Sequence, residues 1–329
     1  MNDYIRQNLD MLDWKKLSIN PNAIALLQEN IERIDWKELS KNQSLGAISL
    51  LEKYSNNIYW PELSSNPNAI HILEQNLDKI DWIILCRNPN AIPLLKENED
   101  KINWYALCEN KNPDAIPLIE QNLDKIHTSY EIIGNNDIAS GDINQREYDW
   151  YMLHWASLSG NPNAIHILKK YPDKIDWRVL SKNPSAIQLL QENLVCIDWS
   201  RLAVNENINL MSRYNLLKVD WELLSGNPYA IDILEQNVDK ITWWMLSKNC
   251  NAIPLLEKNI RNINWGCLSR NPNAIHLLKE NQERINWYNL SSNPNAIDLL
   301  YENKNNINWT ELSSNLNEDL WYDGKIVLK

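Results

Sequence analysis

The sequence predicts an all-α fold, an α-solenoid of about 14 short helix-turn-helix repeats of 22 residues, with a right-handed superhelix expected. Three observations predict it. Trp recurs at a spacing of 22 residues over most of the chain, Asn-Pro follows most of these Trp residues at a distance of six, and no segment alternates apolar and polar residues as a half-buried strand would. The repeated Trp residues are Trp14, Trp36, Trp60, Trp82, Trp104, Trp155, Trp177, Trp199, Trp221, Trp243, Trp265, Trp287 and Trp309.

A short helix is expected to begin at each repeated Trp. The preceding residue is Asp or Asn in most repeats and Thr242 in one, and such side chains accept a hydrogen bond from an unpaired backbone N–H at a helix start. A Leu three residues after the Trp shares its face, and Asn-Pro limits the helix to one or two turns. Because the chain has 16 Trp and no Phe, we expect the indole N–H to find an acceptor at each interface between repeats while the ring fills the core.

A second, longer helix is expected to begin at the Pro of Asn-Pro. In the copy at 271–281, Asn271 is the cap, Pro272 is the first helical residue, and the motif Ala-Ile-x-Leu-Leu forms one apolar stripe. Asn281 is expected to end the helix in the left-handed conformation. The Asn of Asn-Pro has two interpretations: a helix cap alone, or an exposed ladder of amides that binds a peptide backbone.

The whole chain, residues 1–329, is interpreted as a single repeat array. Residues 1–13 form a partial N-terminal unit, because the pattern enters in the middle of a repeat. Residues 128–154 lose the repeat pattern and have the composition of a loop, which indicates a degenerate unit that carries a loop. Residues 316–329 also lose the pattern and are interpreted as a C-terminal cap or tail.

Composition excludes several classes of partner. The chain carries 32 Lys and Arg against 43 Asp and Glu, a net charge of −11, which argues against nucleic-acid binding. No apolar run is long enough to span a membrane, and the first residues lack the basic-then-apolar order of a signal peptide. The five Cys fit reduced thiols better than disulfides. These features predict a cytoplasmic protein without nucleic-acid or membrane partners.

Neither catalysis nor metal binding is expected. His71, His166 and His276 share one position, where other repeats carry Pro or Asp, which is typical of an exposed and variable site. No Ser, Cys or Asp recurs beside them at triad-like positions, and the Cys residues show no C-x-x-C spacing. Cys86 and Cys108 take a position that is Ser in most repeats and are interpreted as small residues at the core edge. The sequence thus predicts no enzyme, no metal and no cofactor.

Positions that do not repeat are the candidates for partner binding. The two residues after each Trp are mostly polar but turn apolar in three repeats, and exposed apolar residues on the variable face of an array are typical of a binding patch. The alternative is that they pack on a local bulge, on the loop at 128–145 or on a neighbouring molecule. His71 and His166, which are expected to be exposed, are included among the candidates. The candidate partner-binding residues are Ile83, Ile84, Tyr105, Trp244, Met245, His71 and His166.

The motif Leu-Ser-x-Asn-Pro-Asn-Ala-Ile-x-Leu-Leu-x-x-Asn-x-x-x-Ile-Asn-Trp at 268–287 resembles the Trp- and Asn-Pro-rich short repeats of giant DNA viruses of the mimivirus type. The resemblance covers almost the whole chain. The layout of the repeat is also similar to the leucine-rich-repeat variant, although the iron–sulfur Cys cluster associated with that family has no counterpart here. The viral resemblance implies an interaction scaffold in the cytoplasm of a host cell.

The sequence therefore predicts a non-catalytic protein-interaction scaffold that binds a protein or peptide along its variable, exposed positions. Such a protein is expected to be a monomer or to self-associate weakly. The alternative is a self-associating structural or virion-associated component.

Overall fold

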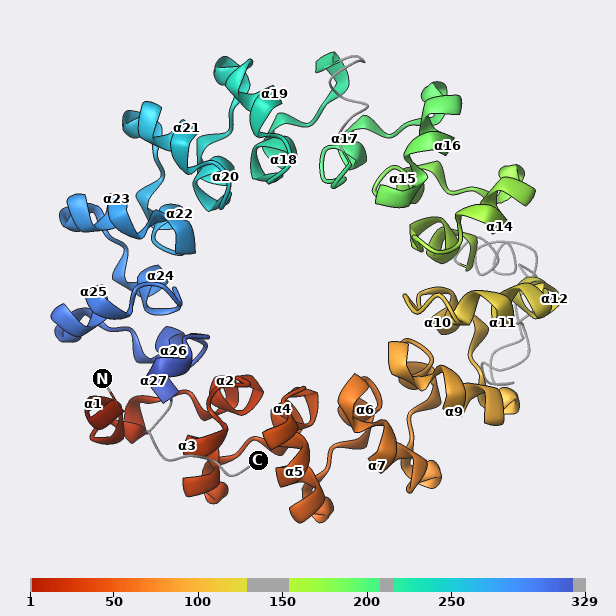
Figure 1. Ribbon diagram of the computed structural model, residues 1–329, viewed down its shortest axis with the longest axis horizontal. Coiled ribbons are helices and arrows are strands. Elements are labelled where there is room, and N and C mark those ends of the chain that lie inside the picture. The colour runs from red at the N-terminus through yellow and green to blue at the C-terminus, as the bar shows by residue number, and fades with distance from the viewer. Residues whose placement is uncertain (1, 129–153, 208–215, 322–329) are drawn as a thin grey trace, which may run out of the picture. The chain divides into compact units, whose positions relative to one another are not determined.

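The computed structural model describes residues 2–128, 154–207 and 216–321. All regular elements in these ranges are helices, and no strand occurs among them. The structure therefore confirms an all-α array of short repeating helices (Figure 1). No helix in the same ranges is both long enough and apolar enough to cross a lipid bilayer.

The chain divides into two compact units. Unit 1 comprises Met1–Ile72 together with Trp221–Lys329, and unit 2 comprises Leu73–Asp220. The predicted degenerate unit at 128–154 and the predicted tail at 316–329 lie mostly outside the described residues. The division of the chain proposed from the sequence and the handedness of its superhelix stay predictions.

The first helix begins at the Trp, as predicted, in every repeat except that of Trp155, where His154 is already helical. Asp13 Oδ1 accepts the backbone N–H of Lys16 at 3.1 Å, and Asn308 Oδ1 accepts that of Glu311 at 2.9 Å. Thr242 departs from this pattern because its side chain makes no capping hydrogen bond. The first helices are α2 (Trp14–Ile19), α4 (Trp36–Lys41), α6 (Trp60–Ser64), α8 (Trp82–Leu85), α10 (Trp104–Cys108), residues 154–160, α15 (Trp177–Leu180), α17 (Trp199–Leu202), α18 (Trp221–Gly226), α20 (Trp243–Lys248), α22 (Trp265–Leu268), α24 (Trp287–Ser291) and α26 (Trp309–Leu312).

The second helix begins about one turn later than predicted. Asn271 Oδ1 accepts the N–H of Asn273, only two residues on, at 3.0 Å, and this tight turn makes Pro272–Ala274 a 3-10 helix before the α-helix starts. The second helices are α3 (Ile24–Glu29), α5 (Leu45–Lys53), α7 (Ile70–Glu74), α9 (Ile92–Glu97), α11 (Ala115–Gln121), α14 (Ile165–Lys170), α16 (Ile187–Glu192), α19 (Ile231–Glu235), α21 (Ile253–Lys258), α23 (Ile275–Glu280) and α25 (Ile297–Glu302). Three further helices are α1 (Asn2–Arg6), α12 (Leu123–Thr128) and α27 (Glu318–Trp321).

The Asn that ends the second helix does not adopt the left-handed conformation that we expected. Asn281 has φ −133° and ψ 51°, and its Nδ2 donates to the carbonyl of Leu277 at 2.9 Å. The side chain satisfies an unpaired carbonyl of the last turn, so no left-handed residue is needed. A short 3-10 helix that the sequence did not predict then follows.

The 3-10 helices fall into two sets. Those that follow the recurring Asn or precede the next Trp are η1 (Leu9–Met11), η2 (Ile31–Arg33), η3 (Ser55–Asn57), η5 (Leu77–Lys79), η7 (Glu99–Lys101), η8 (Pro172–Lys174), η10 (Leu194–Cys196), η12 (Leu216–Lys218), η13 (Val238–Lys240), η14 (Ile260–Asn262), η16 (Gln282–Arg284) and η17 (Lys304–Asn306). Those that contain the Pro of Asn-Pro are η4 (Pro67–Ala69), η6 (Pro89–Ala91), η9 (Pro184–Ala186) and η15 (Pro272–Ala274).

Leu and Ala, rather than Trp, fill the centre of the core. Leu17 and Leu27 are fully buried, whereas most of the repeated Trp residues stand partly exposed at its edge. The indole N–H of Trp14 donates to a carbonyl at 3.2 Å, but those of Trp36 and Trp265 have no acceptor among the described residues. The prediction of an indole hydrogen bond at every interface is therefore wrong, because water reaches a ring at the core edge.

Neighbouring repeats are joined by hydrogen bonds between Ser or Asn side chains and the backbone. Ser269 Oγ donates to the carbonyl of Trp265 at 2.7 Å and accepts the N–H of Asn286, in the next repeat, at 2.9 Å. Asn293 Nδ2 donates to the carbonyls of Ser269 and Asn271 at 3.0 Å each. This Asn is fully buried and its amide is used within the array, so the hypothesis of an exposed Asn ladder that binds a peptide is wrong.

The two ends of the chain meet inside unit 1, at a contact between residues 4–29 and 304–321 that we call the seam. In Figure 1 the last helices, α26 and α27, lie beside the first ones, and α27 packs on α3. Leu320 and Trp321 of α27 are buried, and Trp321 Nε1 donates to the carbonyl of Asn315 at 2.8 Å.

The seam repeats the contacts of two consecutive repeats. The N–H of Asp13 donates to Ser313 Oγ at 2.9 Å, and Asn20 Nδ2 donates to the carbonyls of Ser313 and Asn315 at 3.2 and 2.9 Å. These are the bonds that Ser and Asn side chains make between repeats elsewhere in the array. The first repeat therefore occupies the place of a repeat that would follow the last one.

Candidate functional site

The residues one, two and five positions after each repeated Trp form a surface that we call the first-helix face. At 100° per residue these positions lie on the side of the helix opposite the buried Leu, which is three positions after the Trp. In each unit the first helices stack on one another along one side and the second helices lie on the other side (Figure 1). Variable side chains of successive repeats are thereby placed next to one another.

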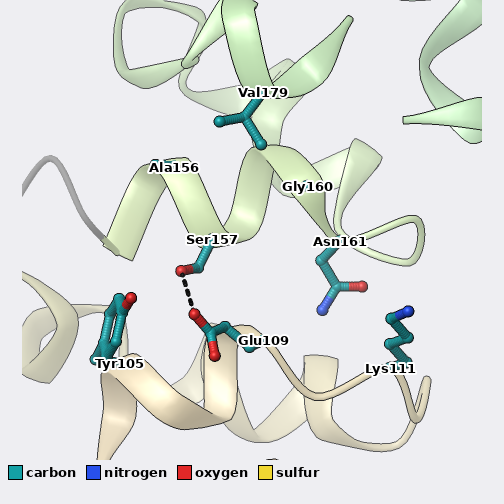
Figure 2. A pocket seen from close by; sticks show the side chains of 8 residues that line it. All are labelled: Tyr105, Glu109, Lys111, Ala156, Ser157, Gly160, Asn161 and Val179. Atoms are coloured by element: carbon teal, nitrogen blue, oxygen red, sulfur yellow. Dashed lines mark hydrogen bonds between the residues drawn. The ribbon is translucent and has the colours of Figure 1, made fainter. Parts of the chain in front are cut away.

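A pocket of about 350 Å³ opens on the first-helix face of unit 2 (Figure 2). It spans the repeats that begin at Trp104, Trp155 and Trp177, and both apolar and polar side chains line it. The size lies within the usual range of ligand sites. The lining residues are Tyr105, Glu109, Lys111, Ala156, Ser157, Gly160, Asn161 and Val179.

The backbone of this site is held by the same Asn contacts that join other repeats. Asn161 is buried, and its Nδ2 donates to the carbonyls of Cys108 and Asn110 at 3.0 and 2.8 Å. The repeat that begins at Trp155 is therefore the direct neighbour of the repeat that begins at Trp104. Buried hydrogen bonds therefore fix the position of Asn161 in the wall of the pocket.

Polar groups at the pocket rim are already paired with one another. The Glu109 carboxylate accepts hydrogen bonds from Arg87 Nε at 2.5 Å and from Ser157 Oγ at 3.4 Å (Figure 2). The Arg87 guanidinium also lies 5.8 Å from the centre of the Tyr105 ring. Lys111, in contrast, is exposed and has no ion-pair partner among the described residues.

The phenol of Tyr105 stays protonated at neutral pH. Burial is the largest cause that raises its pKa, and the negative charge of Glu109 and the hydrogen bond to it raise the pKa further. The ring stands edge-on to His154, with 5.6 Å between the ring centres. Tyr105 thus presents an aromatic surface to the pocket, and its hydroxyl is hydrogen-bonded to Glu109.

The predicted residue Tyr105 lines the pocket, and Ile83 and Ile84 lie one repeat before it. Ile83 is 53% exposed and holds the same position in its repeat as Tyr105 does in the next, while Ile84 is partly buried. Arg87 belongs to the repeat of the two Ile residues and contacts both Tyr105 and Glu109. The structure therefore connects these three predicted residues to one surface of unit 2.

The other predicted residues lie elsewhere. Trp244 and Met245 belong to unit 1, where Trp244 is 40% exposed under the Lys248 ammonium, 4.3 Å from the ring centre. Met245 is partly buried, with its methyl group directed at the backbone of Gly226 in the preceding repeat.

His71 and His166 lie on second helices, α7 and α14, and not on the first-helix face. The Nε2 of His71 is 2.8 Å from the carboxylate of Glu52, and that of His166 is 3.1 Å from the carboxylate of Glu120. A hydrogen bond from Lys170 is the main cause that lowers the pKa of Glu120. The structure does not place these His residues beside the apolar candidates.

Side chains with metal-binding or nucleophilic chemistry do not gather in the described part of the chain. No group of three or more His, Cys, Asp or Glu there could hold a metal ion. Cys86 and Cys108 are fully buried, and burial raises the pKa of the Cys86 thiol to about 11 and that of Cys108 further still. Such thiols are poor nucleophiles at neutral pH.

Sequence reasoning missed most of the pocket. Glu109, Ser157, Gly160 and Val179 were not among the candidates, because none of them is an exposed apolar or catalytic residue type. One signal was available. The fifth residue after the Trp is larger than Gly in almost every repeat, whereas it is Gly160 in this one, and the chain has only 7 Gly.

The chain matches no protein-family model, no curated protein and no solved structure.

Proposed function

We propose that the chain is a non-catalytic scaffold that binds a peptide or protein segment on the first-helix face of unit 2. The pocket beside Tyr105 is the observation that carries this proposal. A cavity lined by a partly buried aromatic ring, in the repeat that follows the exposed Ile83, is the usual form of an anchor site for a side chain of a partner.

The state of the polar groups in the pocket supports binding rather than catalysis. Glu109 is neutralised by Arg87 and accepts from Ser157, and the raised pKa of Tyr105 moves it away from the phenolate form. A general base or nucleophile needs a pKa near the working pH and a partner that activates it. The rim groups instead offer fixed donors and acceptors that orient a bound segment.

The resemblance of the repeats to those of giant DNA viruses supports a narrower proposal. A viral scaffold of this kind would act in the cytoplasm of the infected host cell. The second candidate function, a self-associating structural component, is favoured by the seam, since its two faces are complementary and could also join two copies.

A peptide selection tests the first candidate. Peptides selected from a random display library on the intact chain would be measured by fluorescence anisotropy against Ile83→Ser, Tyr105→Ala and Val195→Ser. Val195 is the matched control, because it is a 98% exposed apolar residue of unit 2 on a 3-10 helix. We expect the first two changes to weaken binding about tenfold or more and the control to leave it within about twofold.

Equal binding by all variants, or no selected peptide, would contradict the proposal. Light scattering on the same protein samples tests the second candidate function. A molar mass that rises with concentration would support self-association, and a constant monomer mass would argue against it.

A further inference from the structure

The first-helix face of unit 2 carries a surplus of positive charge, although the chain as a whole has a net charge of −11. Among the described residues that define this face in unit 2, four are cations and a single one, Glu109, is an anion. Lys111 adds a further cation at the wall of the pocket. The four cations of the face are Arg87, Arg178, Lys182 and Arg201.

Most of these cations have no carboxylate partner in the described part of the chain. Arg87 is the exception, because its Nε lies 2.5 Å from the carboxylate of Glu109. The other side chains are exposed or partly exposed and form no ion pair with a described residue; they are Lys111, Arg178, Lys182 and Arg201.

The aspartates that precede α15 and α17 are engaged by the backbone instead. Asp176 Oδ1 accepts the N–H of Val179 at 2.9 Å, and Asp198 Oδ1 accepts the N–H of Arg201 at 3.0 Å. These carboxylates are used as helix caps and make no ion pair with the cations beside them in the described residues.

In unit 1 the chain supplies the carboxylates itself. Lys41 Nζ lies 3.1 Å from Glu38 and 3.6 Å from Glu62, and Lys16 Nζ lies 2.8 Å from Glu311. All three Glu residues stand two positions after a repeated Trp. In unit 2 that position holds no carboxylate in any repeat: it is Ile84, Ala106, Ser157, Val179 and Arg201.

We propose that the first-helix face of unit 2 binds an acidic peptide segment, whose carboxylates pair with the cations that lack a partner there. This inference rests on the proposed function and gives the charge of its partner. Complementary charge across an interface speeds association and selects the partner, and guanidinium groups bind carboxylates through two parallel hydrogen bonds.

An acidic peptide fits this face better than a nucleic acid, which would offer phosphates to the same cations. Apolar side chains stand among the cations, since Val179 is partly buried and Val204 is 42% exposed. A peptide can alternate carboxylates with apolar side chains, whereas a nucleic acid carries a charge on every nucleotide and is repelled by a chain with a net charge of −11.

The repeat spacing sets the length of the probe. Neighbouring helices lie about 8–10 Å apart and an extended peptide advances about 3.3 Å per residue, so one repeat corresponds to about three residues. The repeats that begin at Trp104, Trp155, Trp177 and Trp199 therefore match a probe of about 12 residues, with Glu at every third position and Leu and Ser between.

Fluorescence anisotropy of this labelled Glu peptide with the intact chain tests the proposal. The controls are the same peptide with Gln in place of Glu, and an oligothymidylate of equal charge. We expect the Glu peptide to bind at least about tenfold more tightly than either control and to lose affinity as the salt concentration rises. Equal binding of the Gln peptide, or tighter binding of the oligothymidylate, would overturn the proposal.

A pair of double variants locates the binding surface. Arg178→Gln with Lys182→Gln removes both cations of α15, and Lys96→Gln with Lys169→Gln removes two exposed cations from the second helices α9 and α14 of the same unit. We expect the first to weaken binding of the Glu peptide about fivefold or more and the second to leave it within about twofold.

Equal binding by the two folded double variants would overturn the proposal. If the α15 variant failed to fold, the three probes on the unaltered chain would still decide. If the Glu and Gln peptides bind alike while Tyr105→Ala still weakens a selected peptide, the acidic chemistry fails and the scaffold function stands.

Discussion

The seam and an interface inside the array use the same hydrogen bonds, although only one of them has a continuous chain across it. We call the contact between the repeats that begin at Trp265 and Trp287 the inner interface. There Asn293 Nδ2 donates to two carbonyls of the preceding repeat at 3.0 Å each, and at the seam Asn20 Nδ2 donates to two carbonyls of the last repeat at 3.2 and 2.9 Å. The geometry of a repeat interface is thus carried by side chains bonded to backbone and does not need covalent continuity.

The seam differs from the inner interface in the burial of its ion pair. At the inner interface Lys279 Nζ lies 3.7 Å from Asp298 Oδ2, and the side chain of Asp298 is 81% exposed. Glu311 of the last repeat is almost fully buried and binds Lys16 of the first repeat at 2.8 Å and Arg270 at 2.8 Å. Solenoid proteins usually need special terminal repeats with a polar outer face, because each end exposes an apolar surface. Here the two ends cover each other, and an ion pair across the join accompanies the hydrogen bonds.

The largest expected effect comes from removing the buried amide of the inner interface. Asn293→Ala removes the partners of the Ser269 carbonyl and of the Asn295 N–H, which Asn293 Oδ1 accepts at 3.0 Å, whereas the carbonyl of Asn271 still accepts the N–H of Ala274 at 3.2 Å. At about 1 kcal/mol for each group that loses its partner, the free energy of unfolding should fall by about 2 kcal/mol. Urea unfolding followed by Trp fluorescence measures this loss.

Asn20→Ala is the matched variant at the seam. It removes equivalent bonds, but the ends can separate while the rest of the chain stays folded, so we expect a smaller loss in global unfolding and a selective loss of amide exchange protection in residues 13–22. An equal fall in the global unfolding free energy for both variants would show that the seam opens only when the whole protein unfolds.

Local elements were predictable because their signals are local. In most repeats an Asp or Asn before the Trp and an Asn-Pro six residues after it give the first helix its start and its end. The conformation of Asn281 was missed, since it depends on a side-chain hydrogen bond to a carbonyl four residues back, and helix-end statistics for Asn favour a left-handed residue instead. The 3-10 helix at Pro272–Ala274 was missed because Asn271 Oδ1 accepts the N–H only two residues on.

The seam and the pocket could not be read from the sequence for a different reason. Asn20 and Asn315 are in phase with the repeat, but the periodicity does not say which repeats contact one another, so it gives no sign that these residues, 295 positions apart, meet within unit 1. Tyr105 was predicted because it is an aromatic residue at a position that is polar in most repeats. The pocket is lined by residues of three repeats, Gly160 and Val179 among them, and most of these residue types give no sequence signal of a binding site.

Removing the charge of Glu311 at the seam is expected to have a smaller effect on stability. Burial opposes ionisation of Glu311, but hydrogen bonds from Lys16 and Tyr288 and the charges of Lys16 and Arg270 outweigh it, so the pKa of this carboxyl is lowered. A lowered pKa means that the stabilisation is present above the unfolded pKa of about 4.3 and is lost as the pH falls through the folded value.

Glu311→Gln should therefore weaken the seam by about 1 kcal/mol at pH 7 and have little effect once the carboxyl of the unaltered chain is protonated. Amide exchange in residues 13–22, followed as a function of pH, measures this loss of stability at the seam. Glu283→Gln is the control, because Glu283 pairs with Arg284 at 3.4 Å while its side chain is 71% exposed. A loss of the same size at acidic and neutral pH would exclude the ion pair as the cause.

The smallest effect on stability is expected from replacing the Ser that joins two repeats by Cys, at the seam (Ser313) and at the inner interface (Ser269). The two Cys variants also allow a direct comparison of how often each interface opens. Cys86 shows that the position accepts sulfur, since its Sγ takes the N–H of Asn103 at 3.3 Å where Ser313 and Ser269 take theirs at 2.9 Å. Ser313→Cys and Ser269→Cys should each cost less than about 1 kcal/mol, because a thiol is a weaker acceptor and donor but fits the same place.

The new thiols then report opening of their interfaces. Burial raises the pKa of the Cys86 thiol to about 11, so a thiol in the closed position reacts slowly with iodoacetamide near pH 8 and labels when the interface opens. Mass-spectrometric mapping should show that position 313 labels at least tenfold faster than position 269, because the seam can separate without breaking the chain's other repeat contacts. Equal labelling rates would mean that end-to-end contact is as strong as contact between covalently joined repeats, and that the whole of unit 1 opens as one cooperative body.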